Sequence, residues 1–393
     1  MPSLHKSRSL SPLVSLRYMD WRLFSLLFLL TALGIAILYS AGRASCVPAT
    51  ACLNQFGGWN PWALSQLPKV ALGFALLIIA ALVDIKVWVA SAYWIYGASI
   101  IALVLVALVG HTGMGAQRWL SIGFMRFQPS EFAKIGVVLA LARYFSGLGM
   151  NEIRSIKHLI IPALIVGLPV LLVVMQPDLG TALSIAIVAT LMFFIVGVEV
   201  RNFVAIALAA MLAAPVVWTF GLHDYQKSRI LIFLDPERDV MGGGYHIMQS
   251  KITIGSGGIA GKGYLQGTQS HLNFLPEKQT DFIFTMFVEE FGMIGALVLF
   301  AIIAGILARV WRIAYESRSN FGKMLAAGVG INFFVYFFVN TAMVMGLLPI
   351  VGVPSPLLSY GGTSMIVILF GFGLAQNCYV HKDEMISGKS SYL

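Results

Sequence analysis

The chain has 393 residues, of which 58% are hydrophobic and only 11% are charged. Soluble domains average about 25% charged residues, and the apolar residues here form runs of about 20, long enough to cross a bilayer as helices. The composition therefore excludes a soluble globular protein. The formal net charge of +9 does not indicate a nucleic-acid partner, because no nucleic-acid-binding motif accompanies it and the short loops of membrane proteins are often basic.

In chain order, the apolar runs predict an all-α polytopic membrane protein with about ten transmembrane helices. The first run follows a basic segment and exceeds the roughly 7–15 apolar residues of a cleaved signal, so we expect it to be retained. The expected organisation is an N-terminal segment 1–22, one membrane domain 23–380 and a polar tail 381–393. The expected spans are 23–41, 68–84, 89–110, 129–146, 159–175, 181–199, 203–222, 281–309, 325–346 and 361–380.

Lysine and arginine residues indicate how the spans are oriented, because short cytoplasmic loops carry an excess of them. The short connections opposite the N-terminus hold Arg43, Lys69, Arg118 and Arg126. The connections on the N-terminal side are richer, with Lys86, Arg143, Arg154, Lys157, Arg201, Arg309, Arg312, Arg318, Lys323, Lys382 and Lys389. Both termini are therefore predicted to be cytoplasmic, since an even number of spans puts them on one side.

The long segment 223–280, between the seventh and eighth spans, is then external, and such loops usually carry function. Its stretch GSGGIAGKG is not a nucleotide-binding P-loop, because Gly263 follows Lys262 where Ser or Thr is required. ATP-driven transport therefore has no support. In another predicted external loop, Cys46 and Cys52 could form a disulfide or remain free thiols, and the sequence leaves both open.

Charged residues inside or at the edge of spans are candidate functional groups. Glu131 and Lys134 are three residues apart at the start of the fourth span, so they share a helix face and can pair. The pair could line a polar path or lock two helices together. Asp178, in QPDLGT, could cap the sixth span or face a cavity, and the two roles are compatible.

Asp281 falls where the external segment re-enters the membrane, in the string FLPEKQTDF. In a partly dry environment the basicity of a carboxylate rises, which suits a general base acting on a sugar hydroxyl. The alternative is that Thr280 or Asp281 caps the eighth helix. The pattern alone favours the cap.

Several cations lie outside or at the outer edge of the predicted bundle: Arg118, Arg126, Lys227, Arg229, Lys251 and Lys262. Clustered beside a cavity they would suit a pyrophosphate group. Taken singly, each can be a solvated loop charge or a contact for lipid headgroups. Composition and spacing do not separate an enzyme from a transporter.

The motifs themselves resemble those of the SEDS family, most closely its RodA-type branch, and they follow one another in the family's order. The strings are GAQRWLSIGFMRFQPSEFAK (115–134), QPDLGT (176–181), DYQKSRI (224–230), GGGYHIMQSKITIGSGGIAGKG (242–263), GTQSHLNFLPEKQTDFIF (267–284) and VGVPSPLLSYGGTS (351–364). The division-type FtsW branch is the alternative within the family. It shares QPSE and the SYGG turn, whereas the GTQ…FLPE form of the external loop is more typical of the RodA type.

The resemblance implies a ten-helix fold with a groove open to the periplasm and to lipid, in the inner membrane of a bacterium. It implies polymerisation of lipid II, a disaccharide-peptide on undecaprenyl pyrophosphate, into glycan strands during cell elongation. The family's essential carboxylate matches Asp281. One departure is Gln279, which stands where the family usually has His, so no histidine at that position takes part in the reaction.

The expected reaction is an inverting transfer in which Asp281 takes a proton from the acceptor 4-hydroxyl and undecaprenyl pyrophosphate leaves. Candidate substrate-binding residues, some from the resemblance and some from the patterns above, are Glu131, Lys134, Arg118, Gln128, Asp178, Arg229 and Lys262. A divalent cation, Mg²⁺ or Mn²⁺, could assist, although the sequence shows no ligand cluster that demands one.

Expected partners are lipid II, the lipid-linked glycan, membrane lipids, a class B penicillin-binding protein and the other membrane proteins of the rod complex, and no nucleic acid. A lipid II flippase is the rival function, because Glu131 and Lys134 would suit a polar path through the bilayer. A scaffold that only recruits a wall synthase is a third reading. Asp281 discriminates, since neither a flippase nor a scaffold needs a base at the outer surface.

Overall fold

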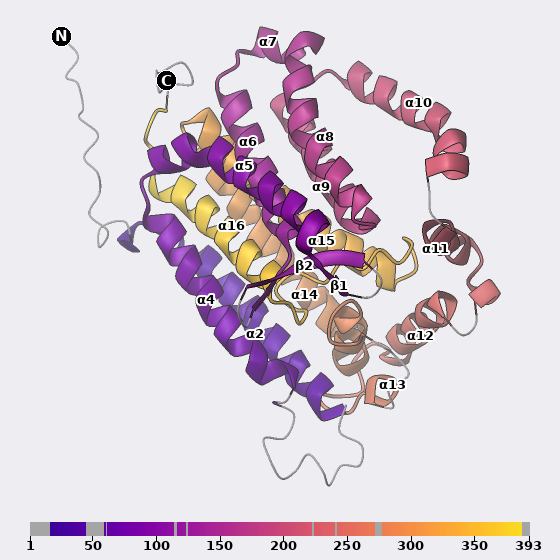
Figure 1. Ribbon diagram of the computed structural model, residues 1–393. Helices are drawn as coiled ribbons and strands as arrows, with labels where there is room; N and C mark the ends of the chain where they lie inside the picture. Colours follow the sequence, from indigo (N-terminus) through magenta and orange to yellow (C-terminus); the bar gives the residue numbers. More distant parts are fainter. Residues whose placement is uncertain are drawn as a thin grey trace, which may run out of the picture.

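The computed structural model of the chain describes residues 16–44, 59, 61–113, 116–122, 125–221, 224–239, 242–271 and 277–386. It is a bundle of long helices (Figure 1), and each of the ten predicted spans corresponds to one of them. These helices are α2 (Trp21–Ala44), α4 (Trp62–Leu82), α5 (Ile85–Val109), α6 (Pro129–Ser146), α8 (Ile160–Met175), α9 (Leu179–Val196), α10 (Val200–Val216), α14 (Ile283–Glu316), α15 (Asn320–Val344) and α16 (Thr363–Val380).

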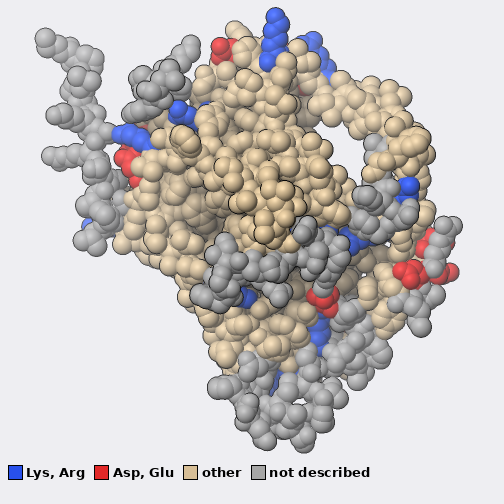
Figure 2. Space-filling view, in the orientation of Figure 1, with Lys and Arg blue, Asp and Glu red and all other residues tan. Residues whose placement is uncertain are grey.

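Within the described residues, eight of these helices are long and apolar enough to cross a membrane. Of the other two, α10 has 17 residues, which is at the short end of the range that spans a bilayer, and α6 carries Glu131, Lys134 and Arg143. Figure 2 shows a broad uncharged surface with charged side chains gathered toward its ends. The chain is therefore a multi-pass, predominantly helical membrane protein, as the apolar runs predict.

One helix boundary differs from the sequence prediction. The second span, expected from 68, begins at Trp62, because Pro68 lies inside α4 and removes one backbone hydrogen bond without ending the helix. The connection between α5 and α6 is a small antiparallel sheet in the order β1-β2-β3. Its strands are β1 (His111–Gly113), β2 (Ala116–Ile122) and β3 (Met125–Phe127).

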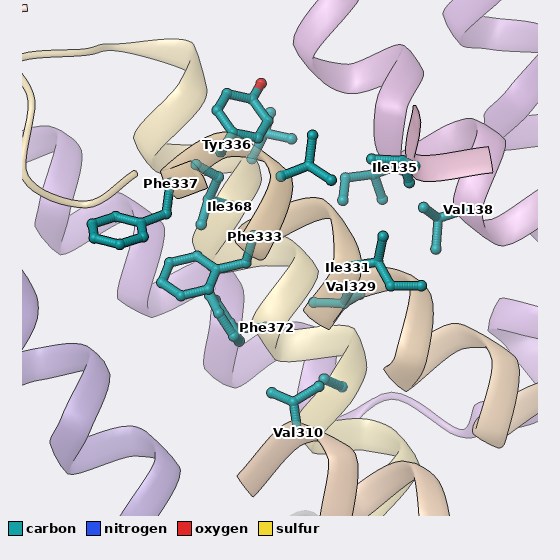
Figure 3. Packing of buried hydrophobic residues seen from close by; sticks show 14 of the residues in the cluster. Ile135, Val138, Val310, Val329, Ile331, Phe333, Tyr336, Phe337, Ile368 and Phe372 are labelled. Carbon is teal, nitrogen blue, oxygen red and sulfur yellow. The ribbon is translucent and has the colours of Figure 1, made fainter. Parts of the chain in front are cut away.

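The core of the bundle is built around α15 and α16, whose spans are 89% and 78% buried, against 22% for α5. Aromatic side chains of the two helices pack together (Figure 3). The ring centroids of Phe333 on α15 and Phe372 on α16 are 5.1 Å apart. Small residues let helices approach closely in such bundles, and a Cβ on Gly373 would meet the backbone of Leu77 on the neighbouring α4. The central helices can therefore hold polar groups away from lipid.

The segment 223–280, which the sequence predicts to be external, is not a plain loop. It forms α11 (Asp224–Leu234), α12 (Gly243–Ser256) and α13 (Thr268–His271), joined by the short turn η4 (Pro236–Asp239). Two further short elements, α7 (Met150–Arg154) and η2 (Ile156–Leu159), connect α6 to α8, and η3 (Val217–Gly221) continues α10.

The Gly-rich stretch packs against a break in α14 at Gly292, where φ is 66° and ψ is −165°. Lys262 N donates to Glu289 O at 3.0 Å, and Met293 N donates to Gly258 O at 3.0 Å. The loop thus pairs backbone groups that the break releases, which cannot stay unpaired away from water. Glycines permit this approach, because a Cβ on Gly292 would overlap the backbone nitrogen of Gly261.

The two ends of α14 define the two ends of the bundle. Its last residue, Glu316, accepts a hydrogen bond from Lys382 Nζ at 3.0 Å, beyond the end of α16. Asp20, before the start of α2, is joined to Gln376 near the end of α16 at 2.8 Å. The first and last spans therefore meet at one end of the bundle, and α14 begins beside Asp281 at the other, called here the site end.

Candidate active site

Asp281 does not cap α14, so the favoured expectation from the pattern was wrong. The helix begins at Ile283, and the capping position is Phe282, which makes no side-chain cap bond. Long-range hydrogen bonds instead hold the backbone before the helix. Tyr360 N donates to Gln279 O at 2.8 Å, and Asn340 Nδ2 donates to Asp281 O at 2.8 Å. The side chain of Asp281 is thereby left available for another role.

Asp281 as a whole residue is half-buried. Burial and, to a lesser extent, the negative charge of Glu277 raise the pKa of Asp281 to about 6, while Arg229 acts to lower it. A carboxylate with this pKa is ionised at neutral pH yet basic enough to accept a proton. The increased basicity expected from the sequence is therefore present.

Four successive residues, 350–353, form a hub at the site end. Arg229 Nη1 donates to Ile350 O at 3.2 Å, and Asn340 Nδ2, which holds Asp281 O, also donates to Val353 O at 2.8 Å. Between these two residues, a Cβ on Gly352 would lie 3.7 Å from Asp281 Oδ2. Residues 350–353 thus bring Arg229 close to the Asp281 carboxylate. Arg229, Asp281 and residues 350–353 are far apart in the sequence.

The hub also reaches Asp178 on the neighbouring α9. A Cβ on Gly180, two residues after Asp178, would overlap the backbone oxygen of Val351. Asp178 caps α9 by accepting from Thr181 N at 3.3 Å, as one of the two expected roles requires. Residues 350–353 therefore approach both the start of α9 and Asp281.

Arg118 and Gln128 join Asp178 in one polar cluster. Arg118 Nε lies 3.8 Å from Asp178 Oδ2, and its guanidinium also donates to the carbonyl of Pro177. Gln128 Nε2 contacts Asp178 Oδ2 at 3.5 Å. Arg118 keeps 28% of its side chain exposed, so an anion entering at the site end can still reach its charge. Asp178 therefore both caps α9 and belongs to a polar cluster with Arg118 and Gln128.

Glu131 and Lys134 form the predicted ion pair, with Nζ 2.9 Å from Oε1. Tyr336 completes it: Lys134 donates to the Tyr336 hydroxyl, which donates to Glu131. Glu131 is 5% and Lys134 2% exposed. Such closed burial supports a structural lock between α6 and α15, and direct contact of this pair with substrate stays a prediction.

Lys262, in the Gly-rich loop, forms an ion pair within the protein. Its ammonium lies 2.8 Å from Oε1 of the fully buried Glu289, and the same oxygen accepts from Gln269 N at 2.8 Å. These contacts fasten the Gly-rich loop and α13 to α14. A role of Lys262 in substrate binding stays a prediction.

Sequence reasoning missed Asn340, Tyr336 and Lys278. The first two could have been noticed as polar residues one helical turn apart in an otherwise apolar span. Lys278 follows Glu277, and burial lowers the pKa of Lys278 to about 8; no local pattern predicts that burial. Cys46 and Cys52 lie outside the described residues.

Nothing in the described residues forms a metal site of three or more His, Cys, Asp or Glu side chains. Asp281 and Glu277 are carboxylates near one another, and Mg²⁺ is often bound by one or two carboxylates together with substrate phosphates. Assistance by a divalent cation therefore stays a prediction.

A helical membrane bundle that carries a basic carboxylate beside Arg229, with Arg118 against the start of α9, defines a membrane-embedded protein equipped for acid–base chemistry on an anionic substrate. Residues 20–384 match the FtsW/RodA/SpoVE family, described as "Cell cycle protein". The chain belongs to this family, which is the SEDS family that its motifs resemble.

Known proteins agree with this assignment. The chain is 43% identical over 323 residues to "Peptidoglycan glycosyltransferase MrdB" of Escherichia coli (strain K12), covering 81% of this chain and 86% of that protein. A solved structure titled "Structural coordination of polymerization and crosslinking by a peptidoglycan synthase complex" matches with a TM-score of 0.77 and 30% identity, over 92% of this chain and 97% of that one. The structure of Thermus thermophilus rod shape determining protein RodA matches with a TM-score of 0.67 and 26% identity, over 93% and 98%.

Proposed function

We propose that the chain is a peptidoglycan glycosyltransferase that polymerises lipid II into glycan strands during cell elongation and rod-shape maintenance. The observation that carries the proposal is the Asp281 carboxylate, with a pKa of about 6, held beside Arg229 and residues 350–353 at the site end. The names of the relatives support the enzyme class, and the rod-shape protein among the solved structures supports the elongation type over the division type.

The reaction is a single displacement. Asp281 accepts the proton of the acceptor GlcNAc 4-hydroxyl as that oxygen attacks the anomeric carbon of the lipid-linked donor. The bond from the anomeric carbon to the diphosphate oxygen breaks, and undecaprenyl pyrophosphate leaves with the electron pair. The proton on Asp281 then passes to water. One displacement inverts the anomeric configuration and forms no covalent intermediate with the protein.

Two arginines suit the leaving diphosphate. Arg229 is close enough to Asp281 to influence its pKa, and the leaving group must lie next to the reacting carbon. Arg118 is part-exposed beside Asp178, at the start of α9. Guanidinium groups bind phosphate oxygens in pairs and stabilise the charge that develops as the bond breaks.

The site end faces the periplasm in this proposal, and both termini are cytoplasmic in the bacterial inner membrane. The cation-rich connections on the terminal side support that orientation. A class B penicillin-binding protein and other rod-complex proteins are the proposed partners, in keeping with the synthase complex whose structure this chain resembles.

The flippase alternative is less well supported. Its sequence support was the Glu131–Lys134 pair, which lies in a closed contact with Tyr336 and is almost fully buried. A polar path for a large headgroup would need these groups to be accessible. A basic carboxylate at the site end, in contrast, has a direct use in the transferase, and a flippase need not place one there.

The test is lipid II polymerisation by purified protein with its partner supplied. Replacing Asp281 by Asn should reduce the turnover about 100- to 10,000-fold, the usual contribution of a general base. A matched control is Glu199→Gln, which removes a half-buried carboxylate paired with the exposed Arg201 at 2.5 Å and should leave turnover unchanged. Equal product from wild type and a well-folded Asp281→Asn variant would remove Asp281 from the mechanism. Absence of product from both, with lipid II translocation intact, would favour the flippase.

A further inference from the structure

A second polar cluster lies at the site end, around Lys69 on α4. Lys69 is the one charged residue of that helix, and its ammonium lies 4.0 Å from the ring centroid of Tyr360. Ser65, one turn earlier, donates to the Tyr360 hydroxyl at 3.3 Å. An ammonium and two hydroxyls are thus gathered where the apolar part of α4 begins.

This cluster is fastened to the backbone that carries Asp281. Tyr360 N donates to Gln279 O at 2.8 Å, and Ser359 Oγ donates to Thr280 O at 2.6 Å. From α4, the fully buried Gln66 donates to Gly361 O at 3.2 Å. The cluster therefore keeps a fixed position relative to Asp281, on the side of residues 359–361, whereas Arg229 and Arg118 lie on the side of residues 350–353.

The charge of Lys69 is not neutralised by a carboxylate within the part of the chain that the structure describes. Its contacts there are with the Tyr360 ring and hydroxyl. Burial acts to raise the pKa of Tyr360, but hydrogen bonds from Lys69 and Ser65 outweigh burial and lower it. Both Lys69 and Tyr360 keep part of their surface exposed, so an anion can replace the phenol as partner of the ammonium.

We propose that Lys69, Tyr360 and Ser65 bind the diphosphate of the acceptor lipid II. The inference rests on the proposed polymerase function, because a polymerase must hold two lipid-linked substrates, each with its own diphosphate. The donor diphosphate leaves from the reacting carbon, so it must lie next to Asp281, where Arg229 is. The acceptor diphosphate is separated from the attacking 4-hydroxyl by a disaccharide, so it must lie further away.

The Lys69 cluster meets that second requirement. It is linked to Asp281 only indirectly, through Tyr360 and the backbone of Gln279, whereas Arg229 acts directly on the carboxylate. An ammonium with neighbouring hydroxyls supplies donors to phosphate oxygens. A basic side chain at a membrane edge can also contact the phosphate of bulk phospholipids, and the experiment separates these two sources of phosphate.

The experiment uses the full chain with its partner in nanodiscs, a short lipid-linked glycan as donor and lipid II as acceptor. KM is measured for each substrate at saturation of the other, for wild type, Lys69→Met and Lys69→Arg. Lys157→Met, at an exposed lysine of the α6–α8 connection, is the matched control. Each protein is assayed in discs of phosphatidylcholine alone and in discs containing phosphatidylglycerol.

We expect Lys69→Met to raise KM for the acceptor about tenfold, the usual effect of losing a charged hydrogen bond, in both kinds of disc. KM for the donor and kcat should stay within about twofold, and Lys69→Arg, which keeps the charge, should raise the acceptor KM less than Lys69→Met does. Tyr360→Phe, which keeps the ring beneath Lys69, should raise the acceptor KM by a smaller factor. This variant carries the test if Lys69→Met does not fold.

An unchanged acceptor KM in folded Lys69→Met and Tyr360→Phe would overturn the proposal. A change in the donor KM alone would place the donor there instead. An effect that appears only with phosphatidylglycerol would assign Lys69 to phospholipid headgroups. The proposed function fails in a different way, with no polymer from the wild-type protein in any disc.

Discussion

Tyr336 and Asn340 lie one turn apart on α15, and each holds a different polar centre of the protein. The Tyr336 hydroxyl donates to Glu131 in the buried ion pair on α6, and Asn340 Nδ2 donates to the backbone oxygen of Asp281. The buried ion pair on α6 and the backbone of Asp281 are therefore held by two side chains that are one helical turn, about 5.4 Å, apart on α15. Substitutions can distinguish residues that only position these groups from residues that contact substrate.

Replacing Asn340 by Leu should slow the reaction without weakening substrate binding. The change removes both hydrogen bonds that Asn340 donates, to Asp281 O and Val353 O. Two carbonyls then lose their donor, which costs on the order of 1–3 kcal/mol each when buried. We expect kcat to fall about tenfold or more as Asp281 loses its fixed position, with KM within about twofold. A rise in KM with unchanged kcat would show that Asn340 instead shapes the binding site.

The turnover rate should fall as the pH drops below about 6, the pKa of Asp281, because the base is then protonated. Only the ionised carboxylate accepts a proton, so kcat should fall about tenfold for each further unit of pH. The measurement is the pH profile of single-turnover polymerisation, with circular dichroism at each pH to exclude unfolding. An acid limb centred near pH 4 would mean that the carboxylate is not raised as its surroundings indicate.

Removing the charge of Arg229 should move that acid limb. Arg229 lowers the pKa of Asp281, so Arg229→Gln should raise the pKa and shift the limb to higher pH. Control variants are Lys227→Gln, a nearby cation on α11, and Arg201→Gln, an exposed cation outside the site. A shift of equal size in Arg201→Gln would attribute the effect to net charge and contradict a local pairing.

The same raised pKa predicts that Asp281 limits stability. A carboxyl whose pKa is higher in the folded state than in the unfolded state disfavours folding once the unfolded form ionises, so stability is lost as pH rises through about 4 to 6. A difference of about two units corresponds to about 3 kcal/mol, and partial exposure reduces it. Asp281→Asn should therefore raise the unfolding midpoint at pH 7 and change it little at pH 4. A destabilised variant at pH 7 would contradict the raised pKa.

The sequence predicts what is encoded locally. Apolar runs locate ten helices, and three-residue spacing pairs Glu131 with Lys134. It fails where distant segments decide the outcome. The cap expected of Asp281 is absent because Asn340 and Tyr360, far along the chain, hold the preceding backbone. Residues 350–353 carry no charge, so no composition rule marks them as the place where Arg229 and Asp281 meet.

The Glu131–Lys134 pair allows a test of lock against substrate contact. Lys134→Met alone leaves Glu131 as a buried unpaired charge and should cost about 3–5 kcal/mol of unfolding free energy. Adding Glu131→Gln removes that charge, so the double variant should recover most of the stability. If the pair is a lock, the double variant should also keep polymerisation within about tenfold per folded molecule. A stable double variant without activity would show that the pair meets substrate.

Gly292 tests the role of the Gly-rich loop. Gly292→Ala puts a side chain at φ 66° and into the backbone of Gly261, so the loop must separate from α14. We expect a loss of about 2 kcal/mol or more in unfolding free energy, together with faster proteolysis within residues 257–271. The matched control is Gly97→Ala on α5, where a Cβ meets no atom within 4 Å; alanine there should stabilise the helix by up to about 1 kcal/mol. Equal stability of the two variants would mean that the loop is not held by the break in α14.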